Sequence, residues 1–259
     1  MSLGPVYEGL NDIPFAISSY ERQLAVASEN SMTPETDAAY CSLTTVYLHQ
    51  AVTQEKEGNI DSALSSYSRC LGAAERSGNV RAAARSNLQM GMLHQKATRW
   101  QEAIFHLRRF LDGGGGEALG DSTFDGLANT TLAQCMMEVN DIDGASSLLE
   151  LYLEASAQKS QQAAVSGQAP VERDLKGIAT AYCTLGVIQY EKQDYAKAVV
   201  SFERLFEISR SIGDRGMTDC ARFNLGASRG ALRISAYMNV VVKDLPKLLS
   251  WKISRKDIF

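Results

Sequence analysis

The sequence is poor in the residues on which most catalytic and metal sites depend. It contains 3 histidines and 5 cysteines among 259 residues. The histidines stand far apart at His49, His94 and His106, and the chain has no H-E-x-x-H, no C-x-x-C and no G-x-S-x-G pattern. A hydrolytic, redox or zinc site needs one of these groupings, because its chemistry requires several ligands or a paired acid and base. The sequence therefore predicts a non-catalytic protein without a metal or cofactor.

The cysteines do not form the pattern of a disulfide framework. Their number is odd and they are widely spaced, at Cys41, Cys70, Cys135, Cys183 and Cys220. Free cysteine usually behaves as a small buried apolar residue. We therefore expect five buried, reduced thiols.

Long apolar runs and a strong charge bias are also absent. No stretch approaches the ~18 consecutive apolar residues that a membrane helix needs. The formal net charge of −4 offers no global basic field for nucleic acid. The first residues, MSLGPVYEGL, lack the basic and apolar regions of a signal peptide. These features predict a cytoplasmic protein with no membrane insertion and no nucleic-acid partner.

Proline is scarce, with 5 residues in the chain, which leaves room for long helices, and a helical pattern recurs. Between residues 179 and 212, two amphipathic stretches meet at a turn, and the second carries Tyr195, Ala198 and Phe202. One spacing pattern recurs along the chain. An aromatic or aliphatic residue is followed three positions later by an alanine, and a large residue stands four positions after that alanine. The alanines of these copies are Ala16, Ala63, Ala103, Ala145 and Ala198. A small residue stands twelve positions before each, at Gly4, Ala51, Gly91, Ala133 and Gly186, and Gly226 follows in the same register.

Residues that favour helix N-termini precede the second stretch of most copies. Asp12, Asn59, Asp141 and Asp194 stand one position before the first large residue, and Thr98 is the expected cap in the copy that has Arg99 there. Side-chain oxygens of these residue types accept the unpaired N–H groups of the first helical turn. Each copy is therefore predicted to be two helices joined by a tight turn.

This register closely resembles the tetratricopeptide repeat, in which a Leu-Gly on the first helix meets an alanine and an aromatic residue on the second. The resemblance implies an all-α fold, a right-handed α-solenoid of helical hairpins that stack into one array. The expected units are residues 1–30, 40–78, 80–112, 122–158 and 176–212, a half unit at 217–230 and a helical C-terminal cap at 231–259.

Four segments depart from the regular repeat. The chain begins in the middle of a predicted helix, as expected for a fragment or an engineered start. The four glycines at 113–116 predict a flexible loop, and residues 155–170 predict a helix extension followed by a loop. Near the C-terminus, the helix around Gly226 is expected to run on to about Val242. Asp244 should then cap a short helix that folds back through Leu248, Leu249 and Trp251.

In the family that the chain resembles, the first helices line a concave groove that binds protein segments. The equivalent positions imply a partner-binding groove made by Leu48, Val52, Arg85, Leu88, Met92, Gln95, Lys96, Thr130, Gln134, Met137, Thr180, Val187, Tyr190, Glu191 and Phe223. Its apolar and methionine content suits an amphipathic helix or an apolar peptide. The Lys and Asn clamp with which co-chaperone members hold a C-terminal carboxylate is missing, because Leu48 and Val52 occupy those positions. A carboxylate there would be buried without a partner.

The period of about 40 residues resembles the longer-helix branch of the superfamily, which includes kinesin light chain. The C-terminal stretch is similar to the ends of cilium- and flagellum-associated members such as tetratricopeptide repeat protein 29. These resemblances imply a protein–protein interaction scaffold or adaptor, in the cytoplasm and in a ciliary, flagellar or cytoskeletal assembly. The alternative from the sequence is a regulatory module that forms a homo-oligomer or blocks its own groove.

Overall fold

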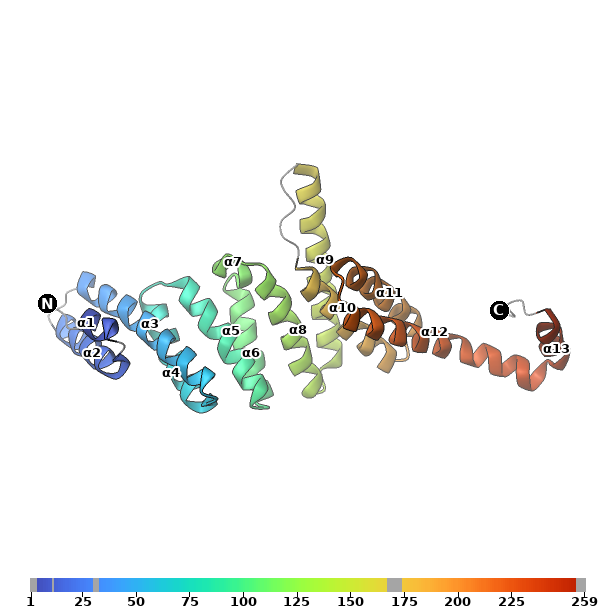
Figure 1. The fold of residues 1–259 in the computed structure, drawn as a ribbon, viewed down its shortest axis with the longest axis horizontal. Helices are drawn as coiled ribbons and strands as arrows, with labels where there is room; N and C mark the ends of the chain where they lie inside the picture. The colour runs from blue at the N-terminus through green and yellow to red at the C-terminus, as the bar shows by residue number, and fades with distance from the viewer. Residues whose placement is uncertain (1–3, 11, 30–32, 167–173, 255–259) are drawn as a thin grey trace. The chain divides into compact units, whose positions relative to one another are not determined.

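The structure is a computed structural model that describes residues 4–10, 12–29, 33–166 and 174–254. Within these ranges it contains helices and no strand, which confirms the predicted all-α class (Figure 1). The chain divides into two compact units, residues 1–145 and 146–259. The predicted starting segment at 1–3, part of the loop at 155–170 and the last five residues lie outside the described ranges.

The first unit consists of packed helical hairpins. Helix α3 packs on α4 and α5 on α6, while α2, α4 and α6 each contact the first helix of the next hairpin. The stacked hairpins confirm the predicted α-solenoid class. The helices are α1 (Gly4–Gly9), α2 (Ile13–Glu29), α3 (Thr33–Lys56), α4 (Ile60–Arg76), α5 (Val80–Lys96), α6 (Trp100–Asp112), α7 (Gly115–Leu119), α8 (Thr123–Glu138) and α9 (Ile142–Ser166), which continues into the second unit.

The repeated alanines and small residues occupy the hairpin interfaces, as the register predicts. All five alanines of the second helices have 0% exposed surface. A methyl group added to Gly4 would collide with the Tyr20 ring, and one added to Gly91 would lie 2.6 Å from Cγ of Leu107. The small residues therefore let each first helix approach the large side chain of its own second helix.

The predicted caps are only partly confirmed. Asp141 accepts a hydrogen bond from the backbone N–H of Gly144 at 3.0 Å, as a capping side chain should. Asn59 precedes α4 but forms no side-chain cap, and its amide contacts Glu57 instead. The prediction for Thr98 is wrong, because its φ is +57° and its hydroxyl donates to the carbonyl of Ala97.

The glycine run is an ordered turn, so the prediction of a flexible loop is wrong. Gly114 and Gly115 have φ angles of +98° and +52°, which other residues rarely adopt. This geometry starts the short helix α7. The N–H of Gly116 donates to Oδ1 of Asp125 at 2.7 Å and ties α7 to α8. The glycines are needed here for backbone shape and close approach.

The second unit contains the rest of α9 and the helices α10 (Leu175–Glu191), α11 (Tyr195–Ile212), α12 (Arg215–Lys243) and α13 (Leu245–Ser254). Helices α10 and α11 form a hairpin on which α12 packs. A methyl group at Gly186 would lie 2.7 Å from the Phe202 ring. Asp194 accepts from the backbone N–H of Lys197 at 3.3 Å and caps α11. As predicted, α12 runs to Lys243, past the place where the earlier first helices end.

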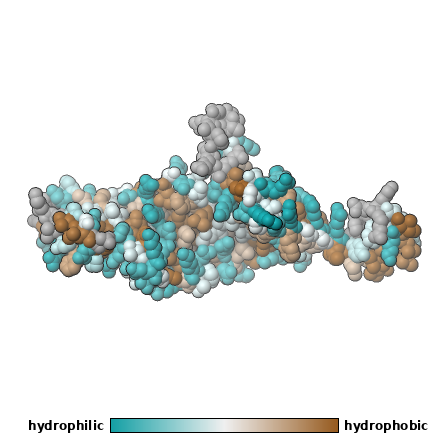
Figure 2. Space-filling view, in the orientation of Figure 1, coloured by the Kyte–Doolittle hydropathy of each residue, from teal (hydrophilic) through white to brown (hydrophobic). Residues whose placement is uncertain are grey.

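The C-terminal part of this unit exposes apolar side chains. Helix α13 packs on α12, where the rings of Trp251 and Tyr237 meet edge to face at 6.5 Å, and Asp244 caps α13 through the N–H of Lys247. The expectation that α13 covers the last repeat remains a prediction. The space-filling view shows apolar surface on both helices (Figure 2). Exposed apolar residues near the junction of these helices and on α13 include Val242, Leu245 and Ile253.

Candidate binding face

The first helices of the first unit form a mixed polar and apolar face. Helix α5 contacts both α3 and α8. The amide of Gln95 donates to Oε1 of Gln134 at 3.0 Å, which joins equivalent positions of α5 and α8. Met92 and Met137 are half-buried, one on each helix. The exposed side chains of Arg85 and Lys96 add positive charge to α5. We call this surface of α3, α5 and α8 the first-helix face.

Other predicted groove residues in this unit serve the core. Leu88 is 1% exposed and Thr130 is 5% exposed, and the Thr130 hydroxyl donates to the carbonyl of Gly126. Leu48 packs against two core clusters and Val52 against one of them. The structure therefore leaves little of Leu88 and Thr130 to a ligand, whereas Leu48 and Val52 are half-buried.

The second unit presents the remaining predicted residues on α10 and α12. Thr180 is half-buried, and its hydroxyl donates to the carbonyl of Lys176. Val187 packs against the α10–α12 core, whereas Glu191 is exposed. Tyr190 is 38% exposed and meets Tyr195 edge to face, while Phe223 is 76% exposed. The accessible aromatic surface here is carried by Tyr190 and Phe223.

A stacked histidine pair, which the sequence analysis did not find, lies between α5 and α6. The rings of His94 and His106 are 5.5 Å apart and nearly parallel, and Nδ1 of His106 lies 3.1 Å from Oδ1 of Asn87. Burial, with His94 and Arg109 adding positive charge nearby, lowers the pKa of His106 to about 4. Burial also lowers the pKa of His94. Both rings are therefore neutral at pH 7. The sequence signal that could have predicted their contact is that the two histidines occupy matching register positions on the two helices of one hairpin.

The cysteines are less uniformly buried than predicted. Cys70 and Cys135 are buried, Cys183 is half-buried, and Cys41 and Cys220 are exposed. Burial, with Cys220 beside it, raises the pKa of the Cys183 thiol to about 11. A thiol with so high a pKa is a poor nucleophile at pH 7. Among the described residues, no cluster of three or more His, Cys, Asp or Glu side chains could hold a metal ion.

Comparison with known proteins identifies one of the repeats. The tetratricopeptide repeat model matches residues 179–212, which span most of α10, the turn and α11. This stretch is a tetratricopeptide repeat. A comparison with curated protein sequences finds no significant match.

Solved structures resemble most of the chain. BtubC (BKLC) from P. vanneervenii is 19% identical, with a TM-score of 0.54 over 88% of this chain and 92% of that one. A putative kinesin light chain of Podosopora anserina, with nearly identical TPR-like repeats, is 14% identical, with a TM-score of 0.46 over 82% and 94%. The MamA protein is 16% identical, with a TM-score of 0.46 over 78% and 96%. The first of these likenesses supports the tetratricopeptide-type fold.

The described helices also bear on the predicted lack of membrane insertion. Across the residues that the structure describes, no helix is both long enough and apolar enough to cross a bilayer.

Proposed function

We propose that this protein is a non-catalytic adaptor whose first-helix face binds a helical or extended segment of a partner protein. The observation that carries the proposal is the hydrogen bond between Gln95 and Gln134, each of which stands three positions from a half-buried methionine, Met92 or Met137. Methionine adapts its shape to apolar side chains, and amides offer both donors and acceptors. Arg85 and Lys96 flank these residues, so the face favours a segment that combines apolar residues with acidic ones.

The second unit adds a separate apolar surface to the proposal. Tyr190 and Phe223 are exposed aromatic residues on α10 and α12. Aromatic side chains supply a large contact area at protein interfaces. A partner with two binding segments would gain affinity by contacting both units, because the second contact becomes intramolecular.

A selection from a displayed helical-peptide library, with the unmodified chain as bait, tests the proposal. The best peptide should lose affinity at least tenfold for the double variant Met92→Glu, Met137→Glu, since two charges would face its apolar residues. Val80→Glu is the matched control, because Val80 is 60% exposed at the start of α5 and a carboxylate suits a helix N-terminus. Equal affinity for all three proteins would refute the proposed face.

We propose further that this adaptor works in a ciliary, flagellar or other microtubule-linked assembly. The support is the resemblance of the C-terminal stretch to ciliary and flagellar members of the superfamily. Imaging of the tagged protein in a ciliated cell tests this, and a diffuse signal with no enrichment on microtubules or cilia would contradict it.

A further inference from the structure

In the described part of the second unit, the last repeat has a first helix, α12, but no second helix packed against its Gly226. At Gly4, Gly91 and Gly186 the space next to the glycine is filled by Tyr20, Leu107 and Phe202 of the following helix. A Cβ built at Gly226, which has the same register, meets no atom within 4 Å. The three earlier glycines are buried, whereas Gly226 is exposed. The position that would normally receive a large side chain is therefore open.

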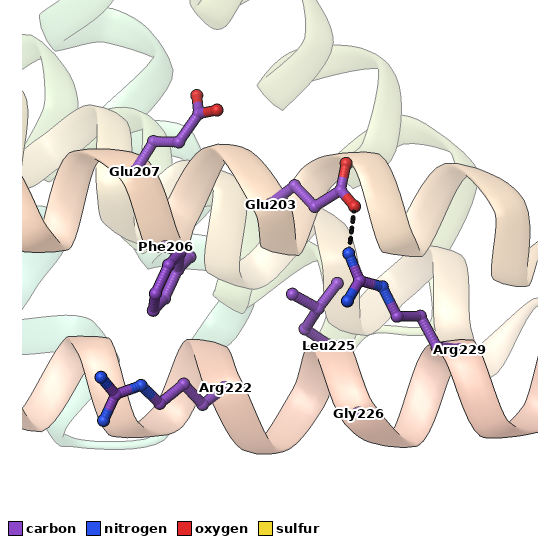
Figure 3. A pocket seen from close by; sticks show the side chains of 7 residues that line it. All are labelled: Glu203, Phe206, Glu207, Arg222, Leu225, Gly226 and Arg229. Atoms are coloured by element: carbon purple, nitrogen blue, oxygen red, sulfur yellow. Dashed lines mark hydrogen bonds and ion pairs between the residues drawn. The ribbon is translucent and has the colours of Figure 1, made fainter.

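A cavity of about 520 Å³ lies at this open position, between α11 and α12. Figure 3 shows Phe206 and Leu225 between the two helices, with Gly226 beside Leu225. Both apolar side chains are half-buried and pack against the α10–α12 core. Glu203 and Arg229 form an ion pair of 2.6 Å across one end of the cavity. We call this cavity and its rim the Gly226 slot.

The charge at the other end of the slot differs from that of an internal repeat. In the first unit, Arg109 of α6 pairs with Glu75 of the preceding second helix at 2.6 Å. Glu75 stands twelve positions after Ala63, and Arg210 stands twelve positions after Ala198 on α11. The guanidinium groups of Arg210 and Arg222 lie 5.6 and 5.7 Å from the centre of the Phe206 ring. Arg210 lies beside the slot without lining it. The lining residues Arg222 and Glu207 are paired with Asp219 and Arg204. Arg210 has no carboxylate partner among the described residues, so a helix in the slot should place an acidic side chain beside Arg210.

None of the chain's own second helices carries an acidic residue at this position. Arg109 stands two positions after the large residue Leu107, and the equivalent residues in the other copies are Arg22, Arg69, Leu151 and Arg204. A second copy of this chain that inserted one of these helices would bring an arginine toward Arg210, or, in the case of α9, an uncharged leucine. Like charges at this distance disfavour the pairing. The slot is therefore better suited to another polypeptide than to a second copy.

We propose that the Gly226 slot binds an amphipathic helix of a partner protein, which completes the sixth hairpin. That helix carries an alanine, a large apolar residue four positions later that packs on Gly226, and a carboxylate two positions after that, which pairs with Arg210. The slot is separate from the first-helix face, so the two sites can bind different segments.

A matched pair of synthetic peptides tests the slot. Both carry the sequence of residues 194–213, which includes Ala198 and Phe202, and one has Arg204→Glu. Binding to the full chain is measured by fluorescence anisotropy, with peptide helicity compared by circular dichroism. The Glu peptide should bind about three- to tenfold more tightly than the Arg peptide, because a repulsion becomes an attraction at a partly exposed site.

Four variants of the chain localise the binding. Gly226→Leu should weaken binding of the Glu peptide at least tenfold, because its side chain fills the slot. Gly72→Leu is the control, since Gly72 is equally open on α4 of the other unit. Arg210→Glu should reverse the preference toward the Arg peptide. The variant Met92→Glu, Met137→Glu should bind both peptides as the unmodified chain does, which separates this proposal from the first-helix face.

Several outcomes would overturn the proposal. The slot is not a helix site if the unmodified chain shows no saturable binding, or if Gly226→Leu binds as tightly as Gly72→Leu. If the chain alone associates with rising concentration and Gly226→Leu abolishes this in sedimentation, a second copy is the occupant and the choice of a foreign helix is wrong.

Discussion

Adding one methyl group at two equivalent glycines should change stability in opposite directions. Gly186 and Gly226 lie in the same unit and share one register, but a Cβ at Gly186 would lie 2.7 and 2.8 Å from two carbons of the Phe202 ring. Phe202 is 1% exposed, so the ring has little room to move. At Gly226 the same methyl group meets no atom within 4 Å.

The expected magnitudes follow from two opposing effects. Replacing glycine by alanine inside a helix stabilises it by about 0.5–1 kcal/mol. Overpacking a filled interior costs about 1–3 kcal/mol. Gly226→Ala should therefore stabilise the second unit by about 0.5–1 kcal/mol. Gly186→Ala should destabilise it by up to about 2 kcal/mol.

Urea denaturation followed by circular dichroism measures both changes, and hydrogen exchange on α11 shows whether the loss lies at the hairpin. Adding Phe202→Leu to Gly186→Ala should recover part of the loss, because leucine is smaller than the ring. The packing argument fails if the two alanine variants shift stability by the same amount, or if the recovery is absent.

Two further predictions concern helix capping and the histidine pair. Asp194→Ala should destabilise its helix by about 1 kcal/mol, because the side chain caps α11, whereas Asn59→Ala should cost a few tenths, because Asn59 forms no cap; equal losses in urea denaturation would contradict this. The pKa of His106 is about 4 in the folded chain against an ordinary value of 6.5, so the unfolded chain takes up the proton first and stability should fall as pH drops from 6.5 toward 4. After a discount for the half-exposed ring, this loss is about 1–2 kcal/mol. His106→Gln should lose less between pH 7 and pH 5, and an unchanged slope would refute the buried neutral pair.

The hairpin interfaces could be predicted from the sequence because they depend on a repeated geometric need. A glycine or alanine on one helix and a large residue on the other recur at fixed spacing, so the sequence alone predicts the interface that joins Gly91 and Leu107. The same periodicity predicted the first residue of each second helix, at Ile13, Ile60, Trp100, Ile142 and Tyr195. These features are local, and each repeat supports the assignment of the others.

Features that depend on a single backbone conformation could not be predicted in this way. Composition alone cannot separate a glycine run that is flexible from one that forms a turn, as residues 113–116 do. The cap expected at Thr98 failed because the turn places that residue at positive φ. Similarly, the repeat register places Leu88 in the groove. Whether an apolar side chain at such a position faces a ligand or a neighbouring helix depends on how closely the hairpins stack.

The spacing of the glycine contacts also has a consequence for how the chain folds. The pairs Gly4–Tyr20, Gly91–Leu107 and Gly186–Phe202 each join residues sixteen positions apart. Closing so short a loop costs little entropy, and chains dominated by such contacts fold rapidly. A hairpin can therefore form once its own thirty or so residues have left the ribosome, before later repeats are made. We expect the nascent chain to gain helicity in steps of one repeat, with each new hairpin stabilised by the one already folded.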